Sequence, residues 1–64
     1  MRLLDILDVI SGGTHIIIYA ENTEVFNGKM CEVSGAEWVA KMGGYMNNKV
    51  IRVNTVDGAI AIAV

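Results

Sequence analysis

The 64-residue sequence has little that could hold a small domain together covalently. Cys31 is its only cysteine and His15 its only histidine, and proline is absent. A single thiol excludes a disulfide within the chain, and a single imidazole leaves a structural zinc site short of ligands. We expect residues 1–64 to form one domain, which at this length buries only about 60% of the surface that its unfolded chain exposes. Self-association is the stabilising device that remains, so we expect a homo-oligomer.

Excess positive charge and long apolar runs are also missing. Five basic residues stand against seven acidic ones, which gives a net charge of −2 and no basic patch for the phosphates of a nucleic acid. The longest apolar run, Ala59 to Val64, is far shorter than the roughly 20 residues that span a bilayer. Asp5 and Asp8 interrupt the apolar segment at the start, which we interpret as part of the fold. We therefore expect a cytoplasmic protein with neither nucleic-acid nor membrane partners.

Two helices are predicted. Apolar residues recur with a 3.6-residue period from Arg2 to Ile10, and Ser11-Gly12-Gly13 ends that segment. Its apolar arc is wider than packing on one sheet requires. The sequence Ser34-Gly35-Ala36-Glu37 matches a capping box, so a second helix begins at Gly35 and ends at Gly43-Gly44. This helix is expected to point three apolar residues inward: Trp38, Val39 and Met42.

Two hairpins are predicted as well. Thr14–Ala20 and Val25–Val33 are joined by a four-residue loop, Glu21–Glu24. Neither face of Thr14–Ala20 is polar, which indicates a strand that is central or is covered on both sides. The second hairpin pairs Lys49–Val56 with Ala59–Val64 across a two-residue type I′ turn, Asp57-Gly58. The sequence thus predicts an α+β domain with the order αββαββ and a small antiparallel β-sheet.

The Asp57-Gly58 turn also sets the register of the last hairpin. Counting outward pairs Val56 with Ala59 and, at the far end, Ile51 with Val64. One face then carries residues that we expect in the core: Ile51, Val53, Thr55, Ile60, Ile62 and Val64. The other face carries the small residues Ala59, Ala61 and Ala63 beside Arg52 and Asn54.

The residue types needed for catalysis are scarce. His15 is the only imidazole that could activate a serine or Cys31 as a nucleophile. His15 is better explained as a structural or rim residue of a strand, and Cys31 as a small buried apolar residue. Asp5 and Asp8 form the solvent edge of the first helix and lack histidine partners for a metal site. We expect no enzyme activity, no cofactor and no metal.

The alanine face of the last hairpin is the first candidate site. The Arg52 guanidinium and the Asn54 amide suit recognition of a carboxylate or phosphate, and Lys49 or Tyr45 from the preceding loop could assist. We expect a small anionic ligand here, such as a signalling nucleotide. Small side chains also allow a helix or a second copy of the chain to pack closely. Both readings can hold at once, because a seam between two copies would form a symmetric anion pocket.

An apolar anchor is the second candidate. Trp38, Met42 and Met46, together with Tyr45, could contact a host protein such as an enzyme or defence effector. This reading makes the chain an inhibitory interaction module. A purely structural role in assembly, through the wide apolar face of residues 2–10, is the third reading.

Three segments carry a resemblance to a known group of proteins. Residues 3–7 (LLDIL), 25–29 (VFNGK) and 48–53 (NKVIRV) resemble small accessory proteins of Firmicutes and their phages, and the likeness covers nearly the whole chain. Members with a role are often anti-defence factors that bind a host effector or take up a signalling nucleotide as oligomers. The resemblance implies stoichiometric binding rather than turnover, and it assigns no functional residue.

Overall fold

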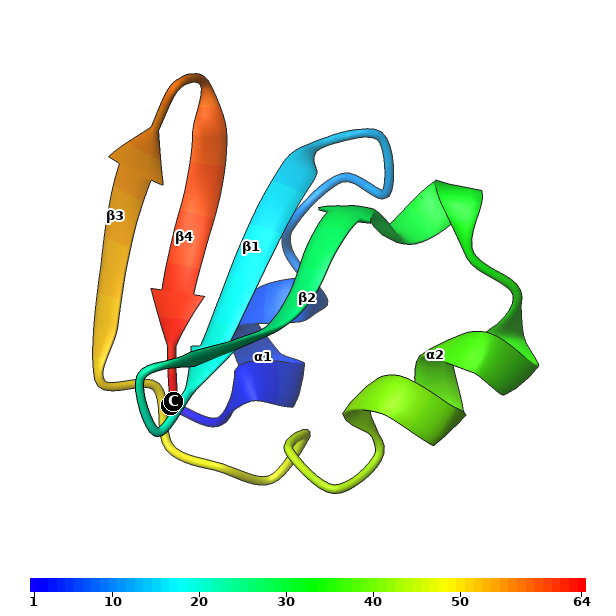
Figure 1. Cartoon of the computed structure of the whole chain (residues 1–64), viewed down its shortest axis with the longest axis horizontal. Coiled ribbons are helices and arrows are strands. Elements are labelled where there is room, and N and C mark those ends of the chain that lie inside the picture. The colour runs from blue at the N-terminus through cyan, green and yellow to red at the C-terminus, as the bar shows by residue number, and fades with distance from the viewer.

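The computed structural model describes all residues, 1–64, as a four-stranded sheet with two helices on one face (Figure 1). The elements are α1 (Leu3–Leu7), β1 (His15–Ala20), β2 (Thr23–Lys29), the 3₁₀ turn η1 (Met30–Glu32), α2 (Gly35–Met42), β3 (Arg52–Val56) and β4 (Ala59–Ala63). The chain is a small α+β fold, and its elements follow the predicted order apart from η1. Neither helix has the length and apolar character needed to cross a membrane.

The sheet is mixed, so the prediction of an antiparallel sheet was wrong. Its strand order is β2-β1-β4-β3, and β1 runs parallel to β4 from the pair Ile16↔Ile60 to the pair Tyr19↔Ala63. The segment that contains α2 carries the chain from the β2 edge to the β3 edge of the sheet. Because both hairpins are antiparallel and β1 is parallel to β4, β3 runs in the same direction as β2. The two hairpins therefore join through β1 and β4. β1 is central, as its two apolar faces predicted.

The first hairpin turn is shorter than predicted. Glu21 and Asn22 alone form it, with φ angles of 53° and 65°, as in a type I′ turn. Thr23 already pairs with Ala20, so β2 begins there and the predicted four-residue loop was wrong. The usual signal for this turn was missing, because neither central residue is a glycine.

The second hairpin confirms its predicted turn and register. Asp57 and Gly58 have φ angles of 49° and 81°, and the pairs run from Val56↔Ala59 to Arg52↔Ala63 as expected. The outermost predicted pair, Ile51 with Val64, is absent. The Ile51 amide donates instead to the Ala63 carbonyl oxygen, 2.8 Å away.

The core lies between the sheet and the helices, and it reaches only part of the predicted face. Its buried cluster comprises Leu3, Leu7, Ile16, Ile18, Phe26, Met42 and Ile62. Ile62 is fully buried, but Val53 is 46% exposed and Ile51 is 73% exposed. Thr55 is exposed as well, and these three residues were wrongly predicted to be core, because the helices lie beside β1 and β2 and leave β3 uncovered (Figure 1).

The helices agree with the sequence in part. α2 begins at Gly35, and the Ser34 Oγ accepts a hydrogen bond from the Glu37 amide at 3.1 Å, as predicted. Val39 was wrongly placed inside, since it is 67% exposed. α1 is shorter than residues 2–10, because the amide of Val9 bonds three residues back in a tighter turn.

Candidate functional site

The face of the sheet opposite the helices, called here the outer face, brings together residues from three strands. β4 places Ala63 between Tyr19 of β1 and Arg52 of β3. One step along, Asn54 lies beside Ala61. The predicted neighbours Arg52 and Asn54 therefore share the outer face with the alanines, and Tyr19 faces Arg52 across Ala63.

These side chains enclose a hollow of about 350 Å³, called here the outer hollow. It is lined by Tyr19, Asn22, Arg52, Asn54, Val56, Ala61 and Ala63. Because neighbouring strands are about 4.8 Å apart, the backbones at Tyr19 and Arg52 lie about 10 Å apart across Ala63. The small alanine side chains leave that space open to a flat group.

The charge at the outer hollow comes from Arg52. The one side-chain ion pair of the chain joins Arg2 to Asp5, so the Arg52 guanidinium has no carboxylate partner. Its N–H donors are free to bind a ligand. Glu21 and Arg52 both line an adjoining hollow of about 260 Å³, and Glu21 is the one acidic residue in the lining of either space.

The two other predicted ligand residues do not line the outer hollow. Tyr45 follows α2 and packs against the core on the helix side of the sheet, so its assignment to this site was wrong. Lys49 pairs through its backbone with Arg2 and also lies outside the lining. Sequence reasoning missed Tyr19 and Asn22, because only the parallel pairing of β1 with β4 brings them to Arg52.

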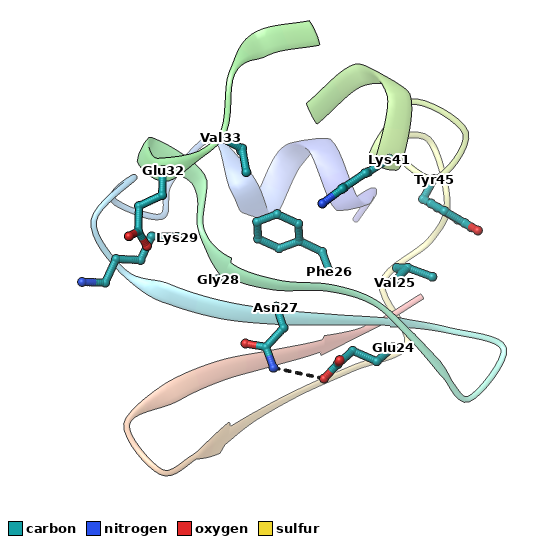
Figure 2. A pocket seen from close by; sticks show the side chains of 10 residues that line it. All are labelled: Glu24, Val25, Phe26, Asn27, Gly28, Lys29, Glu32, Val33, Lys41 and Tyr45. Atoms are coloured by element: carbon teal, nitrogen blue, oxygen red, sulfur yellow. Dashed lines mark hydrogen bonds between the residues drawn. The ribbon is translucent and has the colours of Figure 1, made fainter. Parts of the chain in front are cut away.

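A larger hollow of about 580 Å³ runs between β2 and α2 (Figure 2). Its lining comprises Glu24, Val25, Phe26, Asn27, Gly28, Lys29, Glu32, Val33, Lys41 and Tyr45. Figure 2 shows the Phe26 ring in the middle of this groove and Lys41 extending from α2 toward it. Two lysines and two glutamates share the lining, so the groove has no excess of either charge.

No protein-family model, curated protein or solved structure matches the chain. The geometry of the outer hollow alone therefore makes it the candidate site. It holds Arg52 without an acidic partner, next to Asn54 as the hairpin register predicted. The groove between β2 and α2 balances its charges internally.

The side chains of the predicted apolar anchor pack mainly against the protein's own core. Met42 is fully buried, so its assignment to a partner surface was wrong. The Trp38 indole is half-buried and meets the Phe26 ring edge-on, with ring centroids 5.1 Å apart. Met46 is also half-buried against the core. A chain this small needs these side chains for its own interior.

The remaining candidates lie apart from the outer hollow. His15 is exposed, and its Nε2 shares a hydrogen bond with the Asn27 Oδ1. The Asn27 amide nitrogen in turn donates to the Glu24 carboxylate at 3.2 Å. His15 therefore belongs to a chain of hydrogen bonds on the strand surface, which is the structural role expected for it. Cys31 was wrongly predicted to be buried; it is exposed in η1, where its amide donates to the Gly12 carbonyl oxygen.

Proposed function

We propose that the protein is a non-catalytic binding protein that holds a small, planar anion, such as a nucleotide, in the outer hollow. One observation carries this proposal: Arg52 has no carboxylate partner and stands with Asn54 beside an alanine floor. Sequestration of a signalling nucleotide, the role that the resemblance implies, would use this arrangement without any chemical step.

Each lining group has a part in such binding. The flat guanidinium of Arg52 can bind a phosphate through two parallel hydrogen bonds. The ring of Tyr19, across Ala63, offers a flat surface on which a nucleobase stacks. Asn22 and Asn54 each carry an amide that both donates and accepts, which suits the polar edge of a base.

Retention rather than turnover fits the same lining. The outer hollow contains a cation, two amides and an aromatic ring, but no carboxylate, imidazole or thiol. General acid–base catalysis uses those groups most often, because their pKa values are easily brought near the working pH. A ligand in this hollow would therefore be held and released unchanged.

The test is titration with adenosine monophosphate, followed through backbone amide shifts in NMR spectra. We expect the shifts to centre on β1, β3 and β4. Removal of a charge-assisted contact in Arg52→Ala should weaken binding about 10-fold to 100-fold. Ala63→Val should abolish it, because the added methyl groups occupy the floor while valine remains favourable in a strand.

Lys41→Ala is the matched control, since it removes one positive charge from the groove between β2 and α2. Its affinity should remain that of the unaltered chain. Equal losses in Arg52→Ala and Lys41→Ala would reduce the effect to net charge, and undiminished binding by Ala63→Val would place the ligand elsewhere. Inorganic phosphate alone, tested in parallel, should bind more weakly because it cannot stack on Tyr19.

A further inference from the structure

The edge strand β3 is the least covered element of the molecule. All five residues from Arg52 to Val56 are exposed, and Val53 and Val56 are each 46% exposed although they are apolar. In Figure 1 β3 forms the outer margin of the sheet, on the side away from α2. A row of backbone N–H and C=O groups therefore faces solvent along this strand.

The opposite edge, β2, carries devices that discourage pairing with another strand. The β1–β2 register shifts between Ile18 and Tyr19, which marks a bulge, and Glu24 and Lys29 place opposite charges along β2. β3 has an unbroken register with β4, and Arg52 is its only charged residue. The two edges thus differ in a way that favours pairing at β3 alone.

The hairpin turn determines which backbone groups of β3 are free. Val56 and Ala59 flank a two-residue type I′ turn, so they form a hydrogen-bonded pair. Hydrogen-bonded pairs alternate along an antiparallel ladder, so Asn54, two residues before Val56, is again hydrogen-bonded to β4. Val53 and Thr55 consequently direct their N–H and C=O groups to the free edge. Two antiparallel copies of β3 can then pair Val53 with Thr55 of the partner, and the reverse.

The ends of β3 restrict this pairing to one register. Ahead of the strand, the Val50 amide already donates to the Met1 carbonyl oxygen at 2.8 Å, and Lys49 pairs with Arg2. Only a two-fold axis at Asn54 uses all five residues of both strands. It sets Arg52 opposite the partner's Val56, so the two Arg52 backbones are about 14 Å apart along the strands and the two positive charges are not directly opposite one another.

We propose that two copies of the chain join through β3 in this register and form one continuous sheet of eight strands. The second copy adds its own outer-face residues, the partner's Asn54 and the partner's Val56, next to Arg52 at the rim of the outer hollow. Their contribution to a ligand rests on the proposed function, whereas the dimer itself rests on the strand edge. Each anion site is thereby lined on one further side by side chains of the partner, which a single copy lacks.

The test measures mass by sedimentation at about 100 μM chain, a concentration at which nearly all chains are dimeric if the dissociation constant is micromolar. The unaltered chain should sediment as a dimer. Val53→Lys combined with Thr55→Lys sets like charges opposite one another in the proposed register and should give monomers. Val53→Lys combined with Thr55→Glu sets opposite charges there and should restore the dimer. Both positions are exposed and lie outside the outer hollow.

Val9→Lys combined with Val39→Lys is the matched control, because both valines are exposed on other elements, and it should remain dimeric. Amide NMR spectra establish that each variant is folded. A monomeric unaltered chain, a dimeric Lys/Lys variant or a monomeric Lys/Glu variant would each overturn the proposal. Adenosine monophosphate binding by a monomeric unaltered chain would overturn the dimer alone, while a dimer that binds no nucleotide would overturn the proposed function alone.

Discussion

At the scale of single residues, the ion pair between Arg2 and Asp5 at the start of α1 is the one ion pair between side chains. The Asp5 Oδ2 accepts from the Arg2 amide at 3.0 Å, and its Oδ1 lies 3.2 Å from the Arg2 guanidinium. The side-chain hydrogen bond with Arg2, then the backbone one, lowers the pKa of Asp5 below its ordinary value of 3.8. The side-chain hydrogen bond to Asp5, followed by the attraction of the Asp5 charge, raises the pKa of Arg2.

This lowered pKa predicts how acid acts on the fold. A carboxyl whose pKa is lower in the folded chain stabilises it above the unfolded pKa, and the contribution disappears as pH falls through the folded one. The urea midpoint should thus drop from neutral pH to about pH 2 by more in the unaltered chain than in Asp5→Asn. Asp8→Asn removes an equal charge from the same segment and should keep the full drop. Identical pH curves for Asp5→Asn and the unaltered chain would count against this role.

At the scale of elements, both hairpins depend on two-residue type I′ turns with φ above zero. Gly58 adopts φ +81°, a region that a side chain makes costly, and no other atom crowds the position. Gly58→Ala should lower the free energy of unfolding by about 1 kcal/mol in urea denaturation. Gly44→Ala is the control, since Gly44 also has open space around it but does not adopt a positive φ. Equal effects at both glycines would contradict the turn assignment.

Local signals explain what the sequence could predict about the elements. The Asp57-Gly58 turn sets the register that brings Arg52 and Asn54 together, so the part of the outer hollow that β3 and β4 line was predictable from neighbouring residues. Tyr19 reaches the same hollow only through the β1–β4 pairing, which joins residues more than 40 positions apart. No turn or cap encodes such a pairing, because it depends on how the hairpins pack as units. The alternation of apolar residues likewise predicted the face of Val53 but not how far the helices would extend over it.

At the scale of the whole molecule, the uncovered strand connects stability with self-association. If two chains pair through β3, only the folded state binds the partner, so mass action should raise Tm with chain concentration. We expect Tm to increase over about a 100-fold concentration range in the unaltered chain. The Val53→Lys, Thr55→Lys variant should melt at one temperature throughout. A constant Tm in the unaltered chain would show that the domain is stable without a partner.

The position of β4 has a consequence for folding during synthesis on the ribosome. Of the four strands β4 is synthesised last, yet it lies between β1 and β3 and contacts both. Until residues 59–63 have emerged, the earlier hairpin has no neighbour at β1, and isolated two-stranded hairpins are at best marginally stable in water. We therefore expect residues 1–58 to remain largely unfolded until β4 pairs with β1 and completes the sheet.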